Sequence, residues 1–238
     1  MHGKDAEGIG TYNEKRLHRI LKRYVTDNAQ CYEARVGRNI ADVLEGERIT
    51  EIQTASFRPL TKKISNYIEN TEYSVTVICP VIFEKTIIRA DKDTGEVISA
   101  KRSPKKGRAT DLFPELFYLG EYIGSPRLEV KILFVNAEEY RFSERMRYRR
   151  AGAYDCDLRP VELVSETVLT DKDSYRQLLL AELPKGEFPS AEFAKITRLK
   201  GRRLSLALAF AVRTGLVSRR AEGKKYIYQV IKHIEEQN

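Results

Sequence analysis

Cysteine and histidine are both scarce in this chain of 238 residues, which has three of each. Cys31, Cys79 and Cys156 lie far apart, so they have neither the spacing of zinc ligands nor that of a disulfide framework. The three histidines are equally scattered. We therefore expect neither a zinc site nor a nucleophile that is activated by histidine.

Long apolar runs are also missing. The longest candidate, residues 204–212, falls well short of the roughly 18 apolar residues that cross a bilayer. The first seven residues are polar and lack the apolar segment of a signal peptide. Hydrophobic residues make up 42% of the chain, which is enough for a globular core. These features predict a cytoplasmic protein without a membrane span.

Positive charge is in excess, with a formal net charge of +8. The basic residues gather in three segments. Each segment taken alone is typical of a solvated loop, but the three together favour a polyanionic partner such as nucleic acid. The segments contain Lys101, Arg102, Lys105, Lys106 and Arg108, then Arg141, Arg145, Arg147, Arg149 and Arg150, and finally Arg202, Arg203, Arg213, Arg219, Arg220, Lys224 and Lys225.

Hydrophobic periodicity in residues 11–136 predicts a mixed α/β or α+β domain, in which helices cover a central sheet. Thr11 is expected to cap the first helix, with Glu14 as its capping-box partner. The expected order is helix, three strands, helix, strand, hairpin, helix and strand. These elements span residues 11–25, 31–36, 39–44, 48–53, 60–68, 74–83, 85–90 with 96–100, 110–123 and 128–135.

The rest of the chain has a different composition. Residues 137–170 are charged and irregular, so we expect a basic connecting region. Residues 171–238 predict three short helices and a basic hairpin, which together describe a small winged-helix domain. The expected helices span residues 173–183, 191–197 and 202–214, and the hairpin strands span 216–220 and 225–230.

Two acids in the first domain suggest chemistry. Asp42 lies on one expected strand and Glu51 on the next, with a tight turn at residues 45–47 between them. If the strands pair, the two carboxylates meet at one end of a sheet, where they repel each other unless a cation lies between them. Oxygen ligands of this kind suit Mg²⁺, although charged residues on the open face of a hairpin are also ordinary.

The segment from Ala41-Asp42-Val43 to Glu51-Ile52-Gln53 resembles the PD-(D/E)XK nuclease superfamily, which includes restriction endonucleases. Members carry an acid on one strand and an acid, any residue and a lysine on the next, followed by a helix. The resemblance covers residues 11–83 well and extends to about 136 in topology alone. Gln53 departs from it, because glutamine stands where the superfamily usually has lysine.

The resemblance implies roles for individual residues. Asp42, Glu51 and the main-chain carbonyl of Ile52 would bind Mg²⁺ or Mn²⁺, and Gln53 would orient the attacking water. Glu14 would be an outer ligand, unless it serves only in the helix cap, and Glu33 is the next acid to consider. Lys62 or Lys63 on the following helix could supply the missing cation.

The resemblance also implies a function. It suggests a metal-dependent endonuclease that hydrolyses phosphodiester bonds in double-stranded or branched DNA, and a homodimer would suit duplex cutting. The alternatives are a DNA-binding or regulatory protein that has lost catalysis, and an RNA-processing nuclease.

The C-terminal region resembles winged-helix domains that bind nucleic acid. The helix at residues 202–214 would be the recognition helix, although its apolar residues also suit a core helix of a protein-docking module. The candidate nucleic-acid-binding residues of the whole chain are Lys62, Lys63, Lys101, Arg102, Lys105, Lys106, Arg202, Arg203, Arg219, Arg220, Lys224 and Lys225.

Overall fold

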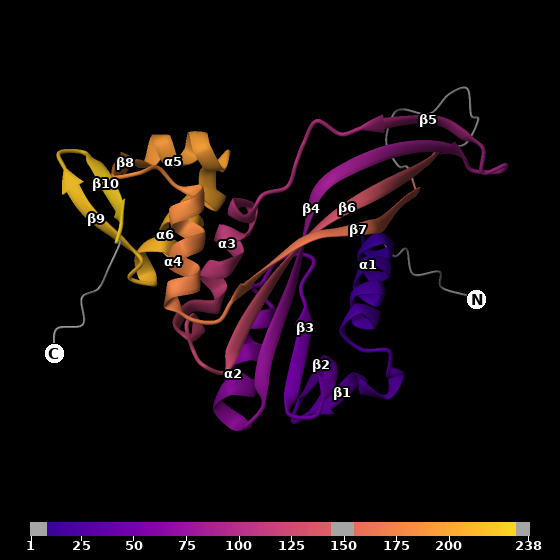
Figure 1. Ribbon diagram of the computed structural model, residues 1–238, viewed down its shortest axis with the longest axis horizontal. Coiled ribbons are helices and arrows are strands. Elements are labelled where there is room, and N and C mark those ends of the chain that lie inside the picture. The colour runs from indigo at the N-terminus through magenta and orange to yellow at the C-terminus, as the bar shows by residue number, and fades with distance from the viewer. Residues whose placement is uncertain (1–8, 144–154, 232–238) are drawn as a thin grey trace, which may run out of the picture.

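A seven-stranded mixed sheet forms the centre of the protein (Figure 1). The computed structural model describes residues 9–143 and 155–231, and leaves the side chains of residues 9–15, 143, 155 and 156 undescribed. The strand order is β1-β2-β3-β4-β6-β7, with β5 paired to β4. β3 and β6 run parallel to β4, and the other pairs are antiparallel. The strands are β1 (Tyr32–Val36), β2 (Asn39–Glu45), β3 (Arg48–Ile52), β4 (Ser74–Asp91), β5 (Val97–Arg102), β6 (Leu128–Ser143) and β7 (Asp155–Leu169).

Helices cover both faces of this sheet, which confirms the expected α/β class. On one face lies α1 (Ile9–Val25), whose Leu17 and Leu21 pack with Ile78 of β4 and Leu133 of β6. On the other face lies α2 (Leu60–Asn70), which buries three residues at helical spacing. The half of β4 that passes between these layers is apolar on both sides, as a covered parallel strand should be.

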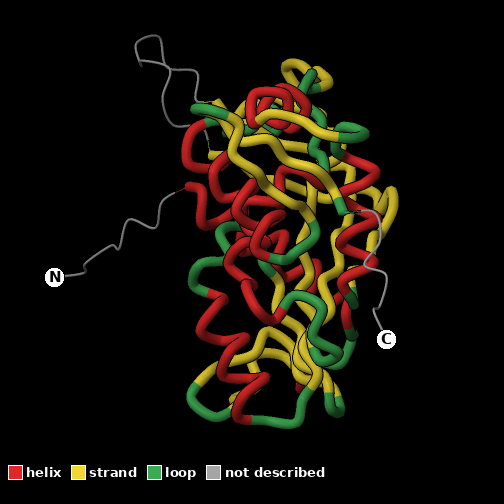
Figure 2. The backbone as a smooth tube through the Cα atoms, turned by 90° about the vertical axis from the view of Figure 1, so that its left-hand side faces the viewer, coloured by secondary structure: helices red, strands yellow, loops and turns green. Residues whose placement is uncertain are grey.

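The C-terminal helices share the core of the α2 face. A broken helical segment comprises η2 (Ala109–Leu112), α3 (Phe113–Leu116) and η3 (Phe117–Tyr122), and α6 (Gly201–Arg213) packs against it. The rings of Phe113 and Phe210 lie 5.8 Å apart within one continuous hydrophobic cluster. Figure 2 views the molecule from the side that carries these helices and the C-terminal hairpin. The remaining elements are α4 (Lys172–Glu182), β8 (Glu187–Pro189), α5 (Ser190–Thr197), β9 (Val217–Glu222) and β10 (Lys225–Val230), and the three strands form a second sheet in the order β8-β10-β9.

Several expected elements differ from the observed ones. Helix α1 begins at Ile9, so Thr11 is not its cap. Residues 74–83 and 85–90 form one strand, and the helix expected at 110–123 is broken, with Gly120 at a φ of 53°. The expectation of an irregular connection at 137–170 is wrong for the described residues, because most of them belong to β6 and β7. β7 is the edge strand beside β6, and its residues 161–166 are all exposed and show no alternation of buried and exposed side chains.

The shared core makes a prediction about stability. Phe210 is 1% exposed. We expect Phe210→Ala to lower the free energy of unfolding by about 3–5 kcal/mol, because it leaves a cavity at the junction with α3. Urea unfolding followed by circular dichroism measures this loss. The matched control is Val97→Ala on exposed β5, which should change stability by less than about 0.5 kcal/mol. An equally small change for Phe210→Ala would contradict a shared core.

Candidate functional site

The two acids lie where β2 and β3 diverge. The antiparallel register between these strands ends at the pair Val43 and Thr50. Beyond this pair, β2 stays with β1, whereas β3 follows β4 to the pair of Ile52 with Ile78. The separation frees main-chain groups of both strands and opens a pocket between α1 and α2.

Asp42 bridges the gap between the diverging strands. Its Oδ2 accepts a hydrogen bond from the main-chain N–H of Ile52 at 2.8 Å and lies 3.1 Å from Nε2 of His18 on α1. Burial tends to raise the pKa of this carboxyl, but the bonds from His18 and Ile52 outweigh it, and the pKa lies below its usual range. Asp42 is therefore held as a carboxylate.

Glu51 is 3% exposed and is enclosed by residues of α2. Nζ of Lys63 lies 3.1 and 2.9 Å from its two oxygens, and the hydroxyl of Tyr67 donates to Oε1 at 2.9 Å. Burial and the negative charge of Asp42 raise the pKa of Glu51 above its ordinary value, although Lys63 and Tyr67 oppose the change. The same burial and the nearby Glu51 raise the pKa of Tyr67, so its hydroxyl remains a donor.

The pocket has a volume of about 1000 Å³ and brings both acids together with basic residues. On the α2 side, Lys63 also donates to the carbonyl of Ile40 at 2.8 Å. Gln53 lines the pocket, and its amide nitrogen donates to the carbonyl of Ser56 at 2.7 Å. The lining residues are His18, Arg19, Lys22, Arg23, Ala29, Tyr32, Glu33, Asp42, Glu51, Ile52, Gln53, Thr54 and Lys63.

The other two acids expected at the site, Glu14 and Glu33, differ in what the structure shows of them. Glu14 belongs to α1, but its side chain lies outside the described residues. Glu33 lines the pocket, with its carboxylate 3.2 Å from Nζ of Lys22. Within the described chain, no group of three or more His, Cys, Asp or Glu side chains is arranged to hold a metal. The oxygens of Asp42 and Glu51 are nevertheless of the type that Mg²⁺ prefers.

The loop behind Gln53 is tied to the C-terminal helices. The main-chain N–H of Phe57 donates to Glu115 of α3 at 3.1 Å. Glu115 in turn accepts from Arg203 of α6 at 3.4 Å, and Arg203 also donates to the carbonyl of Asp111 at 2.8 Å. Arg203, expected to contact nucleic acid, therefore makes contacts within the protein.

The remaining basic residues differ in their contacts. Arg102 and Lys106 pair with Glu84, Arg108 pairs with Glu182, and Arg220 pairs with Glu187. Arg219 lies over the ring of Tyr226. Exposed residues with no ion pair in the described chain are Lys62, Lys101, Lys105, Arg202, Lys224 and Lys225. Four other expected cations, Arg145, Arg147, Arg149 and Arg150, lie outside the described residues.

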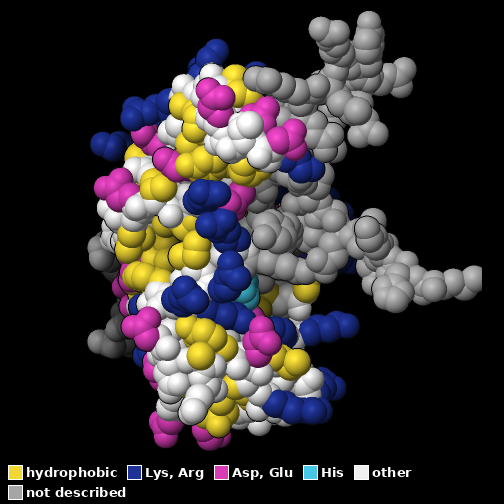
Figure 3. All heavy atoms as spheres, turned by 90° about the vertical axis from the view of Figure 1, so that its right-hand side faces the viewer, with side chains coloured by type: hydrophobic (Ala, Val, Ile, Leu, Met, Phe, Trp, Pro, Cys, Tyr) yellow, Lys and Arg dark blue, Asp and Glu magenta, His cyan; other side chains and the backbone are white. Residues whose placement is uncertain are grey.

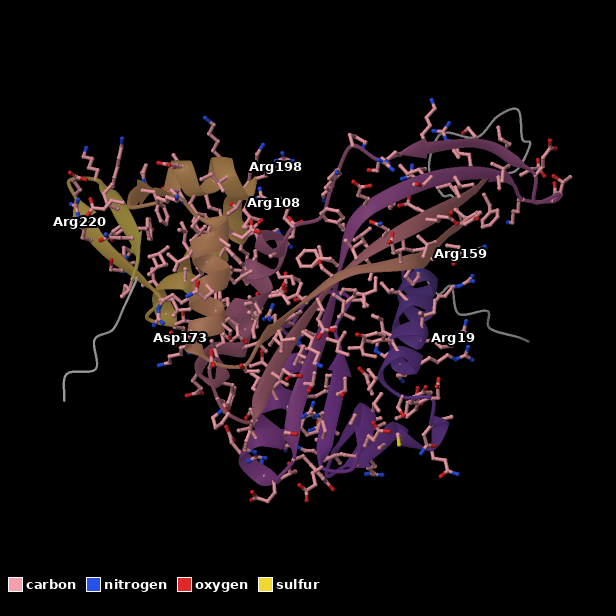
Figure 4. The ribbon with its side chains drawn as sticks, viewed as in Figure 1. Arg19, Arg108, Arg159, Asp173, Arg198 and Arg220 are labelled. Atoms are coloured by element: carbon pink, nitrogen blue, oxygen red, sulfur yellow. The ribbon has the colours of Figure 1, made fainter. Side chains whose placement is uncertain are left out.

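Sequence reasoning missed the basic side of α1. His18, Arg19, Lys22 and Arg23 all line the pocket, whereas the scarcity of histidine was used only to argue against a zinc site and a histidine-activated nucleophile. The available signal was their spacing, because residues four apart share a helix face. Arg19 projects from α1 on the side of the molecule that also carries Arg159, whereas Arg108, Arg198 and Arg220 lie toward the C-terminal helices and hairpin (Figure 4). Lys and Arg side chains gather on this face of the molecule (Figure 3).

Comparison with known proteins places the pocket within a family. The model of the family described as Domain of unknown function (DUF8091) matches residues 15–170. The chain belongs to the DUF8091 family. A protein of Treponema pallidum (strain Nichols), described as an uncharacterized protein, is 27% identical over 181 residues, which cover 74% of this chain and 70% of that relative. No solved structure matches the chain. The DUF8091 match includes every pocket residue and ends before α4.

The charges around Glu51 predict opposite effects of two substitutions. Asp42→Asn should lower the pKa of Glu51, because it removes a neighbouring negative charge. Lys63→Met should raise that pKa, because it removes the paired cation. Carbon-detected NMR titration of the Glu51 carboxyl measures both shifts, and two shifts of the same sign would contradict the arrangement.

Lys63→Met should also change how the stability of the folded protein depends on pH. Since the pKa of Glu51 is raised in the folded state, stability falls as pH rises from its ordinary value of 4.5 through the folded value. Lys63→Met should extend this loss to higher pH, and urea unfolding at several pH values measures it.

Proposed function

We propose that the pocket hydrolyses phosphodiester bonds in nucleic acid with the help of Mg²⁺ or Mn²⁺. The observation that carries this proposal is the pair of carboxylates, Asp42 and Glu51, which face one pocket and whose charges oppose each other. A divalent cation is the ligand that relieves such repulsion. When bound, the metal would supply a water of lowered pKa and stabilise charge on the phosphate oxygens.

The residues of the pocket suit a divalent metal ion. Both hydrogen bonds of Asp42 go to Oδ2, so within the described chain Oδ1 remains available as an acceptor. Glu51 would contribute an oxygen in exchange for part of its contact with Lys63. The carbonyl of Ile52 remains the expected third ligand, and His18 is placed to hold Asp42 in orientation.

Lys63 would replace the lysine that is absent at Gln53. Its ammonium reaches the acid pair from α2 rather than from β3, and it is held between Glu51 and the carbonyl of Ile40. Gln53 binds Ser56 through its amide nitrogen, which leaves its amide oxygen to accept a hydrogen bond from the attacking water.

The partner would be nucleic acid, in keeping with the net charge of +8. The C-terminal elements follow the order helix, strand, helix, helix, strand, strand, which supports the winged-helix proposal. Double-stranded or branched DNA remains our first expectation, RNA the alternative, and a homodimer would suit duplex cutting. The cytoplasm is the proposed location. Among the described helices, none is long and apolar enough to cross a bilayer.

A binding protein without catalysis is the second candidate. The contact that favours it is the one between Lys63 and Glu51, because an ammonium already neutralises the buried carboxylate. In that case the pocket would hold nucleic acid without cutting it.

Substitution of either acid separates these candidates. Asp42→Asn and Glu51→Gln should each lower Mg²⁺- or Mn²⁺-dependent cleavage by roughly 10²-fold or more while binding is kept, because they remove metal ligands. Gel assays with labelled duplex, branched and single-stranded DNA and with RNA measure cleavage. The matched control is Glu47→Gln in the exposed β2–β3 turn, which should cut like the wild type. If the wild type cuts none of these substrates with either metal, the hydrolase proposal fails.

The tip of the β9–β10 hairpin should contribute to binding. Replacing Lys224 and Lys225 together by glutamine should lower the slope of log Kd against log salt concentration by about one for each lysine that contacts a phosphate. Arg203→Gln should leave that slope unchanged, because Arg203 is engaged by Glu115. Fluorescence anisotropy at several salt concentrations measures both. An unchanged slope for the double variant would remove the hairpin from the binding surface.

A further inference from the structure

One wall of the pocket is a basic face of α1. Arg19, Lys22 and Arg23 line it, and Lys22 and Arg23 follow Arg19 by three and four residues, so both lie near Arg19 on the helix surface. Arg19 and Arg23 are exposed and have no ion pair among the described residues. Neither the acid pair nor the proposed ligand set uses these three cations.

Lys22 is the unusual member of this group. It is 7% exposed, and burial of an ammonium group costs several kcal/mol unless a partner compensates. Its compensating contact is with Glu33, whose side chain is 75% exposed. The ammonium also lies 5.9 Å from the centre of the Tyr32 ring, and that ring is fixed by a hydrogen bond from its hydroxyl to the carbonyl of Thr26.

Glu33 reaches Lys22 from a strained backbone. Its φ of 53° lies in the left-handed region, which is costly for a residue with a side chain. The carboxylate is largely exposed to solvent, so an incoming anion can reach the contact between Glu33 and Lys22. A phosphate that approaches Lys22 would compete with this carboxylate rather than with a buried partner.

The basic residues of α1 lie next to the acid pair along the helix. His18 lies beside Asp42, and Lys22 lies one helical turn further on, which is about 6 Å along the axis. We propose that Arg19, Lys22 and Arg23 form a phosphate subsite, which holds the backbone of a nucleic-acid strand next to the phosphate that faces Asp42 and Glu51. Lys22 exchanges Glu33 for the strand. The inference rests on the proposed function for its substrate class.

The subsite can be tested without catalysis. Anisotropy of a labelled single-stranded oligonucleotide in EDTA measures binding by the full chain. Lys22→Met keeps the apolar stem of the side chain and should weaken binding roughly tenfold. Glu33→Gln should tighten binding, because it removes the competing charge. Lys185→Met, in the exposed turn before β8, removes the same charge far from the pocket and should leave affinity unchanged.

Two variants at exposed positions keep the test valid if the Lys22→Met protein does not fold. Arg19→Gln and Arg23→Gln alter exposed side chains, and each should weaken binding and lower the salt slope by about one. Wild-type affinity in both variants, or in a folded Lys22→Met protein, would overturn the subsite. If these variants weaken binding but the wild type never cuts, the subsite stands and the hydrolase proposal fails. If the wild type cuts and all three variants bind and cut like it, the subsite alone fails.

Discussion

The buried negative charge of Glu51 is the constraint on which the rest of the pocket depends. Removing a carboxylate from water costs several kcal/mol, and the charge of Asp42 adds to that cost. Lys63 offsets both, and it can do so only because α2 is fixed by Ile64 and Tyr67 in the core. The position of the cation therefore follows from helix packing. A metal ion would enter a site in which the negative charges of Asp42 and Glu51 already favour a cation.

Divergence of β2 and β3 creates the space for these charges. A fully paired hairpin would satisfy its main-chain groups and close the gap, whereas here the carboxylate of Asp42 binds the N–H of Ile52. The burial of Leu17 and Leu21 holds α1 over the same opening, and this places His18 beside Asp42. One side of α1 thus stabilises the fold, and an adjacent side supplies the basic wall of the pocket.

What the sequence predicts well is local. Asp42 and Glu51 lie on neighbouring strands of one short hairpin, so a period of two was enough to place them near each other, whereas the sequence left Lys62 and Lys63 as alternatives for the cation. The contact of His18 with Asp42 joins α1 to β2, and that of Arg203 with Glu115 spans 88 residues. No local pattern encodes such contacts. Residues 137–170 include most of β7, an edge strand whose residues 161–166 are all exposed, so this stretch lacks the alternation that identifies strands.

The contact between Arg203 and Glu115 limits what α6 can do. Glu115 holds the N–H of Phe57, so Arg203 supports the loop that follows Gln53. If Arg203 turned toward a base, it would give up its contacts with Glu115 and with the carbonyl of Asp111. Readout of a groove by Arg203 would therefore compete with contacts that Arg203 makes inside the protein. Contacts of the C-terminal region with nucleic acid should come instead from the exposed lysines at the hairpin tip, which hold no other part of the protein in place.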